Sequence, residues 1–366
     1  MKLAILGTRG IPANYGGFET FAEELSSRLV ARGHDVTVYG RSNNIRYPER
    51  IYKGVRLVVL PTIPTKHLDT VAHTAISVVH AMFRRFDAAL VCNAANAIFC
   101  SIPRLTGTPV ALNVDGIERK RKKWGPAGRA FYHVSEYLAT RIPNVIVTDA
   151  AVIQDYYMKR YGAPSTMIAY GADSTRLQTT EIQQKLGVPP GGYALYVSRL
   201  EPENNAHVVV EAYRRVTTTM PLLIVGNAPY AGDYIAGLKA AADPRVHFTG
   251  GIYGQGYREL QSHAFVYIHA TEVGGTHPAL VEGMACGNCV IVYDTPENRE
   301  AAGDCALYFD SADSLARQIQ RTIDEPELVA RLRASARDRA ERLFSWDAIA
   351  DRYERLFLEM TDRRLK

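Results

Sequence analysis

Residues 269–300 read HATEVGGTHPALVEGMACGNCVIVYDTPENRE and follow a short apolar strand that we predict at 265–268. The chain then passes through Val273-Gly274-Gly275-Thr276 and enters a helix at Pro278, where the missing N–H of proline costs nothing. Glycines before a helix N-terminus leave backbone N–H groups unpaired, and with the helix dipole these groups can bind a phosphate. Glu282 lies one turn into the helix, within reach of a neighbouring hydroxyl. The stretch predicts a site for a pyrophosphate flanked by sugar hydroxyls, with a tight packing turn as the alternative.

The chain before this stretch alternates between strand and helix patterns. An apolar strand at 2–6 leads through a long loop into a helix at 18–32, which carries an apolar stripe at helical spacing. Because strand and helix patterns alternate, we expect a parallel sheet with helices on both faces. Further strands are predicted at 36–39, 55–60, 88–91, 109–113, 145–148 and 166–169, and further helices at about 70–85, 126–141 and 150–161.

The alternation pauses after residues 170–173 and then starts again. We therefore predict an α/β protein with two Rossmann-like domains, at 1–175 and 190–345, whose parallel sheets face a central cleft. The amphipathic helix expected at 346–366 would pack back on the first domain. Strands of the second domain are predicted at 193–197, 221–225, 246–248, 265–268, 289–293 and 306–309.

The composition is that of a soluble globular protein. Of 366 residues, 47% are hydrophobic and 22% charged, and a net charge of +5 does not indicate a nucleic-acid partner. Five cysteines lie mostly in apolar segments, which favours buried thiols over disulfides, and Cys286 and Cys289 lack the further ligands of a zinc site. The N-terminal apolar segment is too short for a signal peptide, and no window approaches the ~18 apolar residues of a membrane span, so we expect a cytoplasmic protein.

The loop at 7–17 lacks the common nucleotide-binding motifs. It has no G-x-G-x-x-G, and the next strand ends in Tyr39-Gly40-Arg41 without an acidic residue for a ribose, which disfavours NAD and FAD. A G-x-x-x-x-G-K-[ST] phosphate loop is also absent. Gly16 and Gly17 nevertheless precede a helix and could let the backbone approach a phosphate. The 11-residue length of the loop favours this role over simple packing.

Arg199 follows the first strand of the second domain, in the segment SRLEPENN at 198–205. A guanidinium at the carboxyl end of a strand can grip a diphosphate through its fork of donors. A surface ion pair with Glu201 or Glu203 is the alternative. The position at the strand end favours ligand binding.

Taken in order, the Gly16-Gly17 loop, the Arg199 segment and the Glu282 helix resemble the retaining glycosyltransferases of family 4, which have the two-Rossmann GT-B fold. The resemblance extends over nearly the whole chain. Within that family, the chain most specifically resembles the bacterial rhamnosyltransferase-like branch. The stretches that carry it are TRGIPANYGGFET at 8–20, NVDGIERKRKKWG at 113–125, VTDAAVIQDYY at 147–157, IAYGAD at 168–173, SRLEPENN at 198–205, VGNAPY at 225–230, VGGTHPALVEGM at 273–284 and ENRE at 297–300.

The resemblance implies roles for several of these residues. Gly16 and Gly17 would bring backbone close to the donor diphosphate, and Arg199 would bind that diphosphate through its side chain. Glu282 would hold the ribose of the nucleotide. Tyr253 would line the site of the nucleotide base. This assignment rests on the place of Tyr253 in the fold rather than on a motif.

The chain departs from the wider family at two positions. It has Asn204 where the wider family has a lysine, and Gly274 where the wider family has a glutamate. One cation is therefore missing from the expected diphosphate site. We expect the loop of Gly274, Gly275 and Thr276 to carry more of the neutralisation through its N–H groups.

Retaining transfer proceeds either by double displacement through a carboxylate or by front-face attack with a stabilised diphosphate leaving group. Arg199 suits the stabilising role, and Asp115, after the strand at 109–113, is the best placed carboxylate for a sugar or acceptor hydroxyl. Glu118 is the second choice, and a helix cap or a partner for the adjacent basic residues is the alternative for either. No D-x-D lies at a suitable place, so we expect neither a metal nor a cofactor.

The strongest charge cluster is the run RKRKKW at 119–124. Lys120, Arg121, Lys122, Lys123 and Trp124 suit the diphosphate of a lipid-linked acceptor or anionic headgroups at the inner face of the cell membrane, with a solvated loop as the alternative. The resembling branch has an aromatic residue in place of the arginine that opens the run, so the acceptor site is expected to differ in detail.

The resemblance implies transfer of a sugar from a nucleotide sugar to a saccharide acceptor, with dTDP-rhamnose as the first donor to test and a growing surface polysaccharide as the acceptor. A sugar-nucleotide 2-epimerase of the same fold is one alternative, but it would need a catalytic acid/base set that the sequence does not reveal. A non-catalytic binder of nucleotide sugars or polyanions is another, and Arg199 and Glu282 argue against it.

Overall fold

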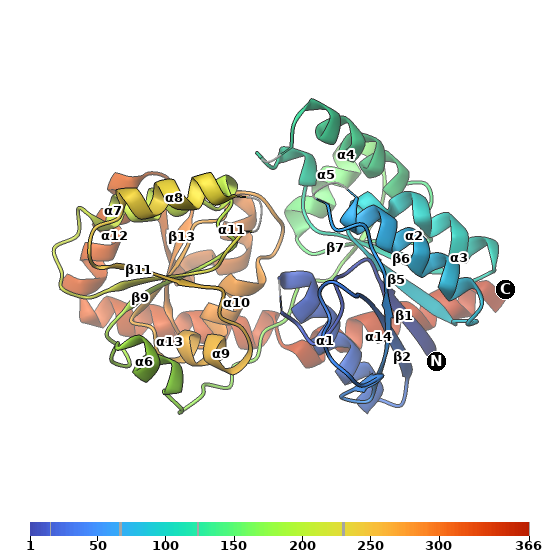
Figure 1. The fold of residues 1–366 in the computed structure, drawn as a ribbon, viewed down its shortest axis with the longest axis horizontal. Helices are drawn as coiled ribbons and strands as arrows, with labels where there is room; N and C mark the ends of the chain where they lie inside the picture. The colour runs from blue at the N-terminus through green and yellow to red at the C-terminus, as the bar shows by residue number, and fades with distance from the viewer. Residues whose placement is uncertain (15, 66–67, 123, 229–230, 366) are drawn as a thin grey trace. The chain divides into compact units, whose positions relative to one another are not determined.

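The computed structural model describes residues 1–366 except 15, 66–67, 123, 229–230 and 366 (Figure 1). The chain divides into two compact units. Unit 1 comprises Met1–Lys120, Trp124–Tyr170 and Trp346–Lys366, and unit 2 comprises Arg121–Lys123 and Gly171–Ser345. Each unit is built on a sheet of mainly parallel strands, which confirms the predicted α/β class.

Unit 1 contains an eight-stranded sheet in the order β3-β4-β2-β1-β5-β6-β7-β8. Strand β3 pairs antiparallel with β4, and the other neighbours pair parallel. The central strands are buried on both faces, which explains why they read as continuous apolar runs. The strands are β1 (Lys2–Leu6), β2 (Asp35–Arg41), β3 (Ile51–Tyr52), β4 (Val55–Leu60), β5 (Ala88–Cys92), β6 (Val110–Val114), β7 (Val145–Thr148) and β8 (Thr166–Met167).

Helix α14 (Trp346–Leu365) belongs to unit 1 and lies beside α1 (Gly17–Ala31), as Figure 1 shows. Phe21, from the predicted apolar stripe of α1, contacts two rings of α14, with centroids 5.3 Å from Tyr353 and 6.5 Å from Trp346. The remaining helices are α2 (Asp69–Met82), α3 (Ser101–Leu105), α4 (Pro126–Ala139) and α5 (Ala151–Tyr161), with 3-10 turns η1 (Ala94–Cys100) and η2 (Glu118–Lys120).

Unit 2 contains a six-stranded parallel sheet in the order β11-β10-β9-β12-β13-β14. Its strands are β9 (Ala194–Val197), β10 (Leu222–Val225), β11 (Val246–Gly250), β12 (Val266–His269), β13 (Cys289–Tyr293) and β14 (Ala306–Phe309). Its helices are α6 (Glu181–Leu186), α7 (Ala206–Tyr213), α8 (Gly232–Ala241), α9 (Gly254–His263), α10 (Pro278–Ala285), α11 (Pro296–Ala302), α12 (Ala312–Asp324) and α13 (Pro326–Leu343), with 3-10 turns η3 (Pro202–Asn204) and η4 (Gly303–Cys305).

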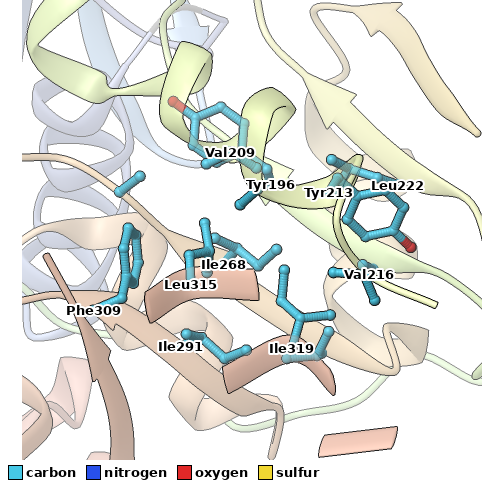
Figure 2. Packing of buried hydrophobic residues seen from close by; sticks show 14 of the residues in the cluster. Tyr196, Val209, Tyr213, Val216, Leu222, Ile268, Ile291, Phe309, Leu315 and Ile319 are labelled. Carbon is cyan, nitrogen blue, oxygen red and sulfur yellow. The ribbon is translucent and has the colours of Figure 1, made fainter. Parts of the chain in front are cut away.

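Helices cover both faces of the unit 2 sheet. On one face, Ile268 and Ile291 of adjacent strands lie against Leu315 and Ile319 of α12 (Figure 2). On the other face, α10 approaches β12 so closely that a Cβ added at Gly283 would lie 2.8 Å from the ring of Tyr267. This close packing fixes the place of α10 relative to the end of β12.

Candidate functional site

The order of connections in unit 2 reverses between β9 and β12, which are neighbours in the sheet. From β9 the chain runs outward to β10 and β11 on one side, and it then returns to β12 and runs outward to β14 on the other. In open α/β sheets, ligands bind beyond the carboxyl ends of the strands at such a switch point. The segments that follow β9 and β12 are those that carry Arg199 and Gly274-Gly275.

The segment after β12 forms the expected turn into a helix. Helix α10 begins at Pro278, as predicted, and His277 is its N-cap residue. Within the described part of the chain, the N–H groups of Gly274 and Gly275 donate to no protein acceptor. With the N-terminus of α10 behind them, these groups suit an anion such as a phosphate. Thr276 is buried beside them.

Glu282 lies one turn into α10, and its side chain is oriented by a neighbouring helix. Its Oε2 accepts a hydrogen bond from the hydroxyl of Tyr257 on α9. Gln261 Nε2 in turn donates to that hydroxyl oxygen at 3.1 Å. Burial, and then the charge of Glu282, raises the pKa of Tyr257 well above its ordinary value, so the tyrosine remains a donor.

Arg199 lies just after β9, and its side chain is about one third exposed. Its Nη1 lies 3.5 Å from Glu201 Oε2, so the ion pair that the sequence left open is present, although such an exposed pair is weak. At the position of the missing lysine, Asn204 donates through one N–H of its Nδ2 to the carbonyl of Arg199 at 2.6 Å. The backbone at Gly226 lies so close to this segment that a Cβ added there would be 1.8 Å from the carbonyl oxygen of Ser198.

Tyr253, the residue expected to line a nucleotide base, is the N-cap residue of α9. It follows β11, whose carboxyl end lies at the same edge of the sheet as those of β9 and β12 because all these strands are parallel. Its side chain is 49% exposed, which leaves the ring open to solvent. Gly251 lies under this ring, and a Cβ there would be 3.0 Å from it.

The basic run does not form one exposed surface. Arg121 is only 4% exposed, and its Nη1 lies 3.9 Å from Oε1 of Glu203, which is itself buried. Lys122 Nζ donates to Glu272 Oε2 at 2.8 Å, within unit 2. Burial thus removes the Arg121 side chain from solvent, whereas the part of the run in acceptor or membrane binding stays a prediction. Lys123 lies outside the described residues.

The other residues of the run belong to unit 1. Arg119 is held by Glu136 and Tyr156, with Nε 3.2 Å from Glu136 Oε2 and Nη2 2.8 Å from the Tyr156 hydroxyl. Lys120 is exposed at the end of η2. Trp124 packs against Tyr132 with ring centroids 5.1 Å apart. Arg119 thus anchors the segment on α4 and α5.

Gly16 and Gly17 lie at the start of α1, with Gly16 as its N-cap residue. Glu19 is a buried residue that the sequence analysis missed. Its Oε1 accepts a hydrogen bond from Arg9 N at 2.8 Å, and a Cβ added at Gly16 would lie 3.4 Å from Oε2. Burial raises the pKa of Glu19. A carboxyl group at this helix N-terminus therefore already faces the backbone that was expected to meet a phosphate.

Asp115 immediately follows β6, and Glu118 begins η2. Burial raises the pKa of Cys92, with smaller contributions from the charges of Glu19 and Asp115, and burial and then the charge of Asp115 raise the pKa of Tyr170. Asp149, at the end of β7, is a further buried acid near Tyr170 that the sequence analysis missed. Unit 1 therefore gathers acidic side chains at the carboxyl ends of its strands.

The cysteines are free, as predicted. Burial raises the pKa of Cys286 and of Cys289 to about 11, which makes both thiols poor nucleophiles. Among the residues that the structure describes, no His, Cys, Asp and Glu side chains gather in a group of three or more that could hold a metal ion. No helix in the described ranges is long and apolar enough to cross a membrane.

Two family models match the chain and together span most of it. Residues 16–171 match a "Glycosyl transferase 4-like domain", and residues 178–339 match "Glycosyl transferases group 1". The first covers Gly16, Gly17 and Asp115, and the second covers Arg199, Tyr253 and Glu282.

Curated relatives are distant. The O-antigen chain mannosyltransferase B of Escherichia coli is 25% identical over 175 residues, which is 45% of each chain. The glycogen synthase of Mycobacterium tuberculosis is 23% identical over 403 aligned residues, covering 98% of this chain and 94% of the relative. The match to the mannosyltransferase thus spans less than half the length of that relative.

Solved structures share the fold over nearly the full length. A sucrose-phosphate synthase from Thermosynechococcus elongatus superposes with a TM-score of 0.84 at 19% identity, covering 99% of both chains. HepE from Anabaena in complex with UDP-glucose gives a TM-score of 0.81 at 18% identity, covering 98% of this chain and 100% of HepE. The two domain matches and this shared architecture lead to one conclusion: the chain belongs to the glycosyltransferases of the GT-B fold, with a 4-like domain followed by a group 1 domain.

Proposed function

We propose that this glycosyltransferase takes its sugar from a nucleoside diphosphate donor and retains the anomeric configuration. One observation carries the proposal. The N–H groups of Gly274 and Gly275, which donate to no acceptor among the described residues, lie on one continuous segment with the carboxylate of Glu282 at the switch point of unit 2. An anion-binding turn followed one helical turn later by an oriented hydroxyl acceptor is suited to a diphosphate joined to a ribose.

Each group has a distinct task in this proposal. The N–H groups and the guanidinium of Arg199 stabilise the negative charge that grows on the diphosphate as the glycosidic bond breaks. Glu282, fixed by Tyr257, accepts hydrogen bonds from the ribose hydroxyls and so places the nucleotide. Asp115 of unit 1 serves the sugar or the acceptor hydroxyl. No step of this chemistry requires a metal ion.

The donor and acceptor are narrower proposals. The rhamnosyltransferase-like motifs support dTDP-rhamnose as the first donor to test, and HepE, solved with UDP-glucose, supports including UDP-sugars. A surface polysaccharide, extended on a lipid-linked carrier at the membrane, is the acceptor that we propose. The O-antigen mannosyltransferase and WaaG, a glycosyltransferase involved in lipopolysaccharide biosynthesis, support this class. Exposed Lys120 is the described cation of the basic run that we propose to meet an anionic carrier.

A thermal-shift screen of dTDP-, UDP- and GDP-sugars tests the proposal. We expect one series to raise the melting temperature, and Arg199→Ala and Glu282→Ala each to weaken its binding about tenfold or more, because a hydrogen bond to a charged group contributes about 1.5–3 kcal/mol. Arg214→Ala removes an exposed arginine from the same unit and should leave binding unchanged.

Two results would contradict the proposal. One is a screen in which none of the nucleotide sugars stabilises the protein. The other is a stabilising donor whose affinity is the same in Arg199→Ala, Glu282→Ala and the Arg214→Ala control.

A further inference from the structure

We propose that His277 is a positioning residue, whose imidazole sets the backbone of the anion-binding turn at Gly274 and Gly275. The inference rests on the proposed function, because it assigns His277 to the site where the donor diphosphate would bind. It concerns a residue that touches the turn rather than the ligand. His277 Nε2 is buried, which places this atom against protein and not against solvent.

The imidazole occupies the space that a side chain at position 274 would need. A Cβ built on Gly274 would lie 2.3 Å from His277 Nε2, 3.0 Å from Cδ2 and 3.2 Å from Cε1. The backbone of Gly274 does not have a positive φ, so its conformation alone does not demand glycine. Glycine is needed here because the ring lies against its Cα, and the path of the turn is consequently set by the ring.

Asn298 holds the ring in one orientation. This buried residue of α11 donates through Nδ2 to the carbonyls of Thr271, at 3.0 Å, and Tyr293, at 2.8 Å. Its Oδ1 is therefore directed at His277 Nδ1, which lies 2.9 Å away. Since an amide oxygen only accepts, His277 carries its proton on Nδ1. The segment after β12 and the last residue of β13 are thus connected to the N-cap of α10 through the side-chain amide of Asn298.

A second histidine supports the ring from the end of β12. His269 is 3% exposed, and its ring centroid lies 4.7 Å from that of His277. Its Nε2 has no hydrogen-bond partner among the described residues. Burial lowers the pKa of both histidines, and each stays neutral at pH 7. For His277, the pKa is raised in part by the hydrogen bond to Asn298, the carbonyl of Val273 and the charge of Glu297. The charge of Arg121 lowers it further, in the same direction as burial. The turn is therefore shaped by an uncharged imidazole, that of His277, which acts as a wedge beside Gly274. The N–H groups of the turn, and not this ring, would bind the anion.

The wedge predicts an effect on diphosphate binding that is separate from nucleoside binding. We expect His277→Ala to weaken binding of the best bound of UDP, dTDP and GDP about tenfold, while the matching nucleoside, measured by competition, changes less than twofold. His277→Asn keeps a donor for Asn298 but leaves the space beside Gly274 empty, so it should recover part of the loss. His247→Ala removes an exposed histidine of β11 and serves as the control. Equal losses for diphosphate and nucleoside, or no loss, would overturn the inference.

A reciprocal pair of variants tests the packing without any ligand. Gly274→Ala should lower the melting temperature because its methyl group meets the imidazole, and adding His277→Ala to it should restore part of that loss. Strictly additive effects, or a Gly274→Ala protein as stable as the wild type, would overturn the inference. If the wild type binds none of the three diphosphates, the proposed function fails, and the melting temperatures still decide whether His277 sets the turn.

Discussion

At the residue scale, the candidate site depends on side chains that hold other side chains. Glu282 is oriented by Tyr257, and Tyr257 by Gln261 at 3.1 Å. Asn204 holds the carbonyl of Arg199 at 2.6 Å. A carboxylate or a backbone segment fixed in this way loses less conformational freedom when a ligand binds, so we expect these supporting residues to contribute to affinity without contacting the ligand.

Tyr257→Phe isolates the supporting hydrogen bond to Glu282. We expect the affinity for the best-bound nucleoside diphosphate to fall about two- to tenfold, because one net hydrogen bond contributes about 0.5–1.5 kcal/mol. Isothermal titration calorimetry measures this loss beside that of Glu282→Ala, which should be larger. A loss equal to that of Glu282→Ala would instead mean that the tyrosine hydroxyl itself contacts the ligand.

The sequence predicts which residues lie at the ends of strands, but not which side chains meet there. Arg199 and Asp115 fall where apolar runs end, and Pro278 begins its helix as predicted, since these are local properties of the chain. The orientation of His277 toward Gly274, which Asn298 of α11 holds, and the contact of Arg121 with Glu203 depend on tertiary packing. Spacing in the sequence carries no signal for the second contact, because its partners are far apart in the chain.

At the element scale, the parallel strands are the most predictable feature. Strands β4, β7, β13 and β14 have the predicted bounds, because their apolar runs end at clear turn signals. The two-residue strand β3 was missed because it is too short to show a period, and η1 and α3 were missed because residues 94–105 are apolar without a helical stripe. Helix α6 was missed as well, and its short length makes it dependent on another element for a cap.

Glu259 of α9 supplies that cap. Its Oε1 accepts from the Thr179 hydroxyl at 2.6 Å and its Oε2 from Ile182 N, in the first turn of α6, at 2.9 Å. These hydrogen bonds, that of Thr179 above all, lower the pKa of Glu259. A lowered pKa means that the folded state prefers the ionised form, so this stabilisation is present at neutral pH and is lost as the pH falls through the folded pKa.

We expect Glu259→Gln to lower the free energy of unfolding at pH 7 by roughly 1–3 kcal/mol, as for other hydrogen bonds to charged groups. The difference in free energy of unfolding between variant and wild type should decrease as the pH falls below about 4.3, the ordinary pKa of glutamate. Urea denaturation between pH 7 and pH 3 measures both quantities. A gap that stays constant across this range would show that the charge of Glu259 plays no part.

At the scale of the whole molecule, unit 1 is assembled from segments far apart in the sequence. Its sheet is formed by strands between Lys2 and Met167, yet α14 packs beside α1 and contributes Phe357 to the buried interior. The amide of Asn113 on β6 also donates to the hydroxyl of Tyr353 at 2.8 Å. The stability of unit 1 therefore depends on residues that follow unit 2.

Adjacent residues of α14 offer a matched test of this dependence. Phe357 is 1% exposed and Leu358 is 48% exposed. Phe357→Ala should cost about 3–5 kcal/mol, as for other buried aromatic residues, whereas Leu358→Ala should change stability by less than about 1 kcal/mol. Hydrogen exchange should rise in β1 and β5 of Phe357→Ala but not in β9 or β12. Faster exchange in β9 and β12 as well would mean that the two units unfold together.

The split composition of unit 1 also bears on how the protein is made. On the ribosome, α1 emerges early with Phe21 and its neighbouring apolar side chains, but the rings of Trp346 and Tyr353 that cover Phe21 are translated only after all of unit 2. Domains generally fold as they emerge, N-terminal first. Here the unit begun first is completed last, so a stalled nascent chain would display an uncovered apolar helix and become a substrate for chaperones.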